Sequence, residues 1–410
     1  MKKLLLVLLI LSLFINHLNA NEKDLQIIQK DKKEYRLLDK ESIQTRQQSQ
    51  KYDWISPIDL SGNIGRNHSF SDENSRNLNN KNTKSASIGF TQSIFESGGI
   101  GFKMDYADNR FKYEMLSWEN QNSQLIYTIY NTLLDIKKLN LEIKQNDYRI
   151  VNKDIELIIK KIQYEAGKTD IIELNNAIMS KNLILKEEIA LKNSLKEKEQ
   201  ELAKYTDLKY DEIEILDFQE TNKDIFLDKN YSILEADAKV EMLNSEYKIK
   251  KSQYLPKLSL SAKASYSSQD EKFNSMINDT NKDDASSSGS LILSMPLYDY
   301  TKSSKIQESK IEVLKQKALV NDLKNETAFE YEQIFTKIDT YLKQNETINK
   351  NIKLYEELIG ANKISSEAGM TSKYDLEILE NTKTINEFDI LINKINILQQ
   401  YAKLYFKIKN

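Results

Sequence analysis

Long stretches of the chain repeat apolar residues at the spacing of α-helices. From Phe102 to Tyr164 nothing interrupts a helical pattern, and about 60 residues at ~1.5 Å each would extend roughly 90 Å. Two apolar series recur there every seven residues, one from Ile129 to Tyr164 and one from Tyr127 to Ile162. Because the series lie about 200° apart around the helix, the helix is predicted to pack on two sides. The last helix repeats the pattern with Ile378, Ile385 and Ile392, and with Leu391, Leu398 and Tyr405. Two packing faces, here called seams, suit a helix that contacts a neighbour on either side in a closed ring of helices. A helix in a solid multi-helix bundle can also pack on more than one face.

Four shorter segments alternate apolar and polar residues with the period of two that marks β-strands. Their apolar positions are Ile58, Leu60, Ile64 and Phe70; Ala86, Ile88, Phe90 and Ile94; Leu258, Leu260, Ala262, Ala264 and Tyr266; and Leu291, Leu293, Met295 and Leu297. The polar segments Ser71–Lys84 and Ser267–Ser288 are predicted to be exposed hairpin loops. The strands suit either two soluble hairpins or a membrane sheet. Four strands cannot close a barrel, and lipid tolerates no open edge, so a membrane sheet would need several chains.

The same elements recur in both halves of the chain. The turn Glu165-Ala166-Gly167-Lys168-Thr169 returns as Glu367-Ala368-Gly369-Met370-Thr371. We therefore predict a first structural repeat over residues 21–205, an equatorial segment over 206–229 and a second repeat over 230–410. Each repeat should contain a helix, two strands and a long helical hairpin.

The chain begins with the three parts of a secretory signal. Lys2 and Lys3 precede an apolar run from Leu4 to Ile15, and Asn16 to Ala20 completes the segment. Residues 1–20 are predicted to be a signal peptide that is cleaved after Ala20. An uncleaved anchor is the alternative, but the apolar run falls short of the roughly 20 residues that a spanning helix needs.

Composition narrows the chemistry. The 410 residues include 10 glycines, 3 prolines, 2 histidines and no cysteine, which favours long helices and excludes disulfides and cysteine-based zinc sites. The net charge of −3 comes from interleaved residues of both signs, so no nucleic-acid interface is expected. Gly167-Lys168-Thr169 lacks the preceding glycine of a phosphate-binding loop. We predict no enzymatic activity, no cofactor and no metal site.

Several motifs occur in a duplicated order. They are Thr91-Gln92-Ser93-Ile94-Phe95 before the first long helix, the strands led by Pro57 and Pro256, Met295-Pro296-Leu297-Tyr298, and the two Ala-Gly turns. In this order they resemble the TolC family of outer-membrane efflux proteins. The resemblance implies a homotrimer in the bacterial cell outer membrane that extends into the periplasm. Its fold would be a long α-helical barrel continuous with a 12-stranded transmembrane β-barrel, four strands from each chain.

The resemblance also implies a function. The trimer would be a passive exit duct of a tripartite efflux pump or a type I secretion system, in contact with outer-membrane lipid, a periplasmic adaptor (membrane fusion) protein and an inner-membrane transporter. It implies a periplasmic gate at Asp375, Glu173 and Tyr164. It implies adaptor docking at the two turns, Gly167, Lys168 and Thr169 with Gly369, Met370 and Thr371. The competing interpretation is a periplasmic coiled-coil adaptor or scaffold without a pore.

Overall fold

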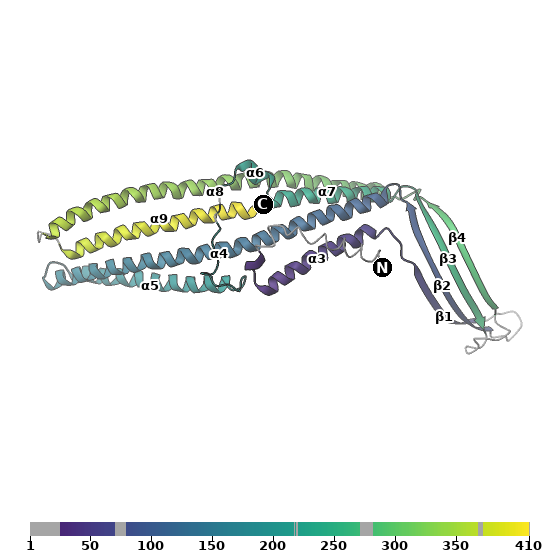
Figure 1. Ribbon diagram of the computed structural model, residues 1–410, viewed down its shortest axis with the longest axis horizontal. Helices are drawn as coiled ribbons and strands as arrows, with labels where there is room; N and C mark the ends of the chain where they lie inside the picture. The colour runs from purple at the N-terminus through teal and green to yellow at the C-terminus, as the bar shows by residue number, and fades with distance from the viewer. Residues whose placement is uncertain are drawn as a thin grey trace, which may run out of the picture. The chain divides into compact units, whose positions relative to one another are not determined.

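The chain is mostly helical with one small sheet, as predicted. The computed structural model describes residues 25–69, 79–216, 218, 220–270, 282–367 and 372–409. Its elements, drawn in Figure 1, are η1 (Leu25–Ile27), α3 (Lys30–Tyr52), β1 (Asp59–Ser69), β2 (Asn79–Phe95), α4 (Gly99–Glu165), α5 (Ile171–Leu202), α6 (Lys223–Asp228), α7 (Tyr231–Ser252), β3 (Lys257–Asp270), β4 (Lys282–Ser294), α8 (Lys302–Glu367) and α9 (Lys373–Lys407). The predicted signal peptide, residues 1–20, lies outside the described residues.

The chain divides into two compact units. Unit 1 contains the residues up to Lys40, Leu116–Glu235 and Asn321–Asn410, and unit 2 contains Glu41–Met115 and Ala236–Val320. Helices α3, α4, α7 and α8 contribute residues to both units. Each unit therefore combines residues from both predicted repeats, 21–205 and 230–410.

In unit 1, α4 contacts α5 on one flank and α9 on another. The α4 series that starts at Tyr127 faces α9, and its two ring contacts join Tyr127 to Phe406 at 6.1 Å and Tyr148 to Phe388 at 5.9 Å. On the α5 flank, the Asn146 side chain donates a hydrogen bond to the Ile184 carbonyl at 3.3 Å. Asn146 lies three residues after Ile143 and four before Ile150, so it shares a face with the series that starts at Ile129. The two heptad series thus mark two different neighbours.

A ladder of polar pairs crosses the α4–α9 interface. Its three rungs are Lys138–Asn396 at 3.5 Å, Gln145–Asp389 at 2.6 Å and Asn152–Thr382 at 3.3 Å. Successive rungs lie seven residues apart on both helices, so the ladder repeats with the same period as the apolar seams. Gln145 also donates to the Ile385 carbonyl at 2.9 Å. Two of the buried side-chain amides of α4, Gln145 and Asn152, are therefore paired with the facing helix.

The predicted equatorial segment, 206–229, packs against the middle of α8 and the C-terminal end of α9 in unit 1. Phe226 on α6 is fully buried in a cluster with Ile334, Ile338, Leu404 and Ile408. Its ring lies 5.6 Å from that of Tyr331, whose hydroxyl donates to the Thr221 carbonyl at 2.9 Å. Burying a phenylalanine of this size contributes about 2–3 kcal/mol. The segment is therefore part of the unit 1 core.

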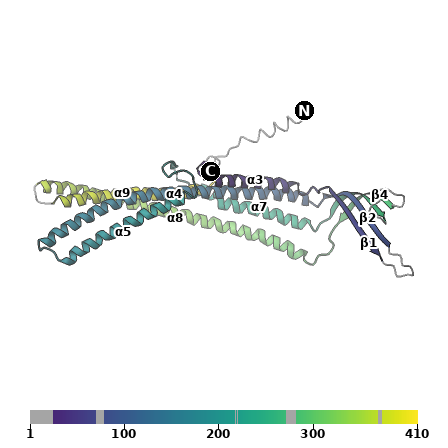
Figure 2. The ribbon, with the colours of Figure 1, turned by 90° about the horizontal axis from the view of Figure 1, so that it is seen from below.

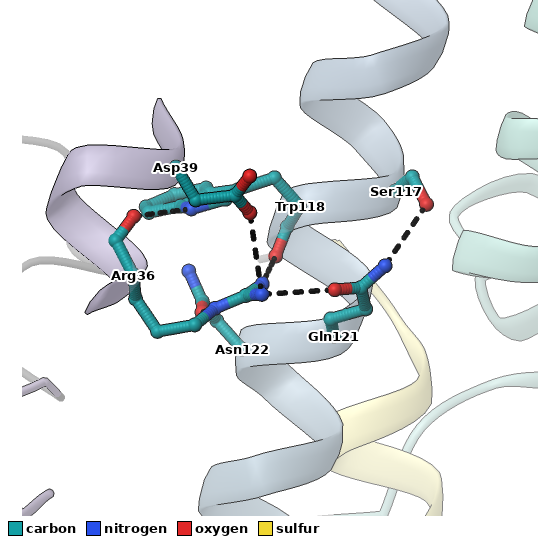
Figure 3. A network of polar contacts seen from close by, with 6 residues as sticks. All are labelled: Arg36, Asp39, Ser117, Trp118, Gln121 and Asn122. Atoms are coloured by element: carbon teal, nitrogen blue, oxygen red, sulfur yellow. Dashed lines mark hydrogen bonds and ion pairs between the residues drawn. The ribbon is translucent and has the colours of Figure 1, made fainter. Parts of the chain in front are cut away.

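An arginine side chain on α3 forms hydrogen bonds to α4 within unit 1 (Figure 3). Arg36 Nε donates to Asn122 at 2.6 Å, while its Nη atoms donate to the Gln121 side chain at 2.9 Å and the Trp118 carbonyl at 3.0 Å. Trp118 returns a hydrogen bond to the Arg36 carbonyl at 2.8 Å. Burial lowers the pKa of the Arg36 guanidinium, and Asp39, 3.4 Å away, counters that shift. Since arginine starts from a very high pKa, the group stays charged and holds both helices.

Unit 2 contains a four-stranded antiparallel sheet in the order β1-β2-β3-β4. Strand β2 from the first half of the chain pairs with β3 from the second half, so the two hairpins form one sheet (Figure 1). Strands β1 and β4 are its edges. The alternative of two separate hairpins does not describe this sheet.

The predicted loops Ser71–Lys84 and Ser267–Ser288 were too long. Strand β2 already begins at Asn79, β3 continues to Asp270 and β4 begins at Lys282. The polar residues of these segments resembled loop signals, but backbone pairing needs no apolar side chains. Ser265 and Ser286, for example, face each other across β3 and β4 with their hydroxyl oxygens 2.9 Å apart.

Three residues turn the chain from β2 into α4. Ser97 and Gly98 have positive φ angles of 51° and 88°. The Ser97 hydroxyl donates to the Pro256 carbonyl at 2.7 Å, which ties the turn to the start of β3. A Cβ on Gly99 would lie only 2.8 Å from Ser252 Oγ. The turn therefore needs glycine at position 98 for its conformation and at 99 for space.

Candidate functional site

The sheet has one apolar face. The strand register places Leu60, Ile88 and Ala264 in one row of this face. Its large side chains are exposed, including Leu60 at 80%, Leu291 at 67% and Leu293 at 73%. An uncovered apolar surface of this kind indicates contact with another apolar phase or with a partner.

The opposite face of the sheet carries hydroxyl groups. Four cross-strand pairs link it: Ser61–Ser87 at 2.8 Å, Thr91–Ser261 at 3.0 Å, Ser93–Ser259 at 3.3 Å and Ser265–Ser286 at 2.9 Å. A sheet that is apolar on one face and polar on the other has the alternation of a strand between lipid and water. Among the described helices, none combines the length and the apolar character needed to cross a bilayer.

The predicted turn between α4 and α5 is well defined. Gly167 has a φ of 67°, and its N–H donates to the Tyr164 carbonyl at 3.0 Å. The N–H of Lys168 donates to the Gln163 carbonyl at 2.8 Å, which completes a Schellman motif at the end of α4. Thr169 follows, partly exposed.

The start of α5 carries the first predicted gate carboxylate. The Asp170 side chain caps the helix by accepting from the Glu173 N–H at 2.9 Å. The Glu173 carboxylate lies 3.0 Å from Lys160 Nζ, so it forms an ion pair on the surface of the α4–α5 hairpin. Tyr164 is exposed at 42% near the same turn.

The second predicted turn is described only from its far side. Gly369, Met370 and Thr371 lie outside the described residues. Ser372 caps α9 by accepting from the Tyr374 N–H at 3.2 Å, and Asp375 is exposed in the first helical turn. Within the described ranges, no hydrogen bond or ion pair joins Asp375 to Glu173 or Tyr164. The end of α8 and the start of α9 lie at the same end of unit 1 as the end of α4 and the start of α5 in both views (Figures 1 and 2).

Exposed isoleucines beside the first turn were not predicted as functional residues. Ile171 and Ile172 open α5 with exposures of 58% and 65%, and Ile162 at the end of α4 is 54% exposed. The pair Ile171-Ile172 directly follows the capping Asp170. Two adjacent isoleucines cannot both face a single helix partner, and this signal was available in the sequence.

The fold, and a segment of somewhat less than half of the chain, match known proteins. Residues 224–403 match the family described as outer membrane efflux protein. The predicted resemblance to this family is confirmed. The family consists of transport proteins, and the predicted location in the outer membrane is confirmed with it. No curated protein is similar enough in sequence to count as a match.

Solved structures of outer-membrane proteins share the fold. VceC from Vibrio cholerae has a TM-score of 0.71 at 13% identity, covering 93% of this chain and 94% of its own. The CmeC outer membrane channel of Campylobacter jejuni has a TM-score of 0.70 at 12% identity, with coverages of 92% and 84%. The open MtrE outer membrane channel of Neisseria gonorrhoeae has a TM-score of 0.68 at 11% identity, with coverages of 94% and 87%. The fold of these outer-membrane proteins therefore covers nearly the whole chain, beyond residues 224–403.

Proposed function

We propose that three copies of this chain form an exit duct in the outer membrane. A 12-stranded transmembrane β-barrel, four strands from each copy, would continue into a long α-helical barrel in the periplasm. The duct would passively conduct substrates from an inner-membrane transporter to the outside, within a tripartite efflux pump or a type I secretion system. Residues 1–20 would direct export of the chain.

The four-stranded sheet is the observation that supports this proposal. One face is apolar and exposed, the other holds hydroxyl pairs, and β1 and β4 are open edges in the single chain. Lipid leaves no water to satisfy the backbone groups of an edge strand. Pairing of β4 from one copy with β1 from the next would satisfy both edges and close the barrel.

Exposed apolar residues on the long helices also suit assembly. Phe329 on α8 is 68% exposed, and Leu183 on α5 is 66% exposed, and both residues belong to unit 1. Neighbouring copies would bury these side chains in the helical barrel. Large apolar side chains left in water are otherwise a liability for a secreted protein.

The two turns would face the partners. The periplasmic adaptor would bind at Gly167, Lys168 and Thr169 and at Gly369, Met370 and Thr371. The exposed Ile171 and Ile172 beside the first turn add apolar area to this surface. Asp375, Glu173 and Tyr164 would line the narrow periplasmic end of the duct.

The mass of the detergent-extracted protein tests the assembly. Native mass spectrometry should give a trimer, and planar lipid bilayers should record channels from the same sample. A monomer or dimer that leaves the envelope without detergent would instead favour the periplasmic scaffold.

Two substitutions at neighbouring positions in β4 test which face of the sheet contacts lipid. Leu291→Lys places a charge on the apolar face and should reduce outer-membrane assembly, because such a charge costs about 2–4 kcal/mol near the bilayer midplane. Ser290→Lys places the same charge on the hydroxyl face and should assemble like the wild type. Equal yields of the two variants in the membrane fraction would contradict the proposed orientation.

A further inference from the structure

One row of the hydroxyl face differs from its neighbours. The register aligns Asp59, Gly89, Lys263 and Ser288 across the four strands. The adjacent described rows hold Thr91, Ser261 and Ser290 on one side, and Ser61, Ser87, Ser265 and Ser286 on the other. Within these three rows the charged residues are Asp59 and Lys263, one acid and one base at the same level.

Glycine keeps the space between the two charges open. A Cβ on Gly89 would lie 3.0 Å from the Ala262 carbonyl and 3.4 Å from Lys263 Cβ. Without it, bare backbone forms the floor of a hollow that Ser61, Ser87, Thr91 and Ser261 border. Asp59 and Lys263 stand on opposite sides of this hollow, two strands or about 10 Å apart, and both are exposed.

We propose that Asp59 and Lys263 balance each other's charge at one level of the barrel lumen and so contribute to the charge selectivity of the duct. This inference rests on the proposed trimeric channel, in which three carboxylates and three ammonium groups would stand at one level of the lumen. The ring would carry no net charge, so it would favour neither cations nor anions among the small solutes that pass. Hydroxyl rows above and below it would solvate a passing ion without adding charge.

Removing one of the two charges should therefore shift the ion selectivity in the direction set by the sign of the charge that remains. Lys263→Gln would leave three carboxylates and attract cations, whereas Asp59→Asn would leave three ammonium groups and attract anions. Charges at these distances in water change local ion concentrations by about twofold. The double variant would again carry no net charge at this level.

The reversal potential in planar lipid bilayers under a KCl gradient measures this effect. We expect Lys263→Gln to raise the K⁺ over Cl⁻ permeability ratio about twofold, Asp59→Asn to lower it by a similar factor, and the double variant to return near the wild type. Lys84→Gln is the matched control, because Lys84 lies in the row of Ile64 on the apolar face. Trimer mass and single-channel conductance verify that each variant is assembled.

The outcomes separate the inference from the function on which it rests. Channels whose permeability ratio is the same in the wild type and all variants would overturn the selectivity role and leave the duct intact. A shift in Lys84→Gln as large as in Lys263→Gln would overturn the face assignment and with it the inference. If the wild-type trimer forms no channels at all, the proposed function itself fails.

Discussion

Gln145 on α4 donates a hydrogen bond of 2.6 Å to the Asp389 carboxylate on α9. The two other α4–α9 polar pairs of the ladder lie seven residues before and seven residues after this one along each helix. Polar groups at core positions of paired helices favour one register, because a slip would leave them buried without partners. The ladder therefore aligns α4 and α9 lengthwise, while the apolar seams supply most of the burial.

Replacing Gln145 should destabilise unit 1 through its unpaired partner. We expect Gln145→Leu to cost about 1–3 kcal/mol, since it removes the donor that Asp389 and the Ile385 carbonyl use. The double variant with Asp389→Leu should recover part of this loss. Denaturant unfolding of the detergent-solubilised protein measures the double-mutant cycle, with the exposed Lys144→Leu as control. If the stability losses of the two single variants were strictly additive, the Gln145–Asp389 hydrogen bond would not contribute to stability.

The glycines at the β2–α4 turn make a matched pair of substitutions possible. Gly99→Ala should lower the yield of folded protein, because the added Cβ would meet Ser252 Oγ at 2.8 Å. Gly101→Ala, two residues later in α4, meets nothing within 4 Å and should be neutral or stabilising by up to about 1 kcal/mol. Thermal unfolding compares the two variants. Rescue of Gly99→Ala by Ser252→Gly would confirm the cause, and equal stability of both alanine variants would contradict it.

The ion pairs of Glu330 should make stability depend on pH. Burial alone would raise the pKa of Glu330, but hydrogen bonds from Lys403 and Lys407, at 2.8 and 2.6 Å, outweigh it and lower the pKa. A carboxyl whose folded pKa is lowered stabilises the fold above its unfolded pKa and loses this contribution as the pH falls through the folded value.

Glu330→Gln should therefore cost about 1–2 kcal/mol at pH 7 and almost nothing once the pH has fallen below the lowered folded pKa of Glu330. Thermal unfolding midpoints across this range measure the difference. Glu332→Gln on the same helix is the control, because its 62%-exposed carboxylate contacts only Lys223 among the described residues and should contribute little at any pH. A difference that persists at acid pH would contradict the ionic origin.

Asp375 should bind multivalent cations if it lines the periplasmic end of the proposed duct. Asp375→Ala should then weaken the block of single channels by such ions added from the periplasmic side, because three carboxylates leave the narrowest ring. Asp322→Ala removes another exposed carboxylate, from α8 and far from the turn, and should leave the block unchanged. An unchanged block in Asp375→Ala would remove this residue from the gate.

Much of the fold could be predicted because it follows from periodicity. The series from Ile129 and from Tyr127 indicated two packing flanks, and α5 and α9 occupy them. The alternation around Leu60, Ile88, Leu260 and Leu291 located the four described strands. These patterns are local consequences of the 3.6- and 2-residue periods, so one sequence suffices to find them.

What escaped prediction depends on contacts between distant residues. Gln145 and Asn152 are polar and interrupt neither apolar series, so their seven-residue spacing alone does not indicate the α4–α9 ladder. The row of Asp59 and Lys263 exists only through the β2–β3 register, which no local pattern specifies. The gate residues remain predictions, since Asp375 and Glu173 lie on separate hairpins and Gly369 lies outside the described residues.

The pairing of β2 with β3 also bears on the order in which the chain folds. Thr91 meets Ser261, which is 170 positions later in the sequence, so the sheet cannot be completed before the second half of the chain has arrived. The helical hairpins close through much more local contacts and should form first. The apolar face of the sheet would then assemble last. A chain that crosses an aqueous compartment would therefore not expose the completed apolar face before it reaches the membrane.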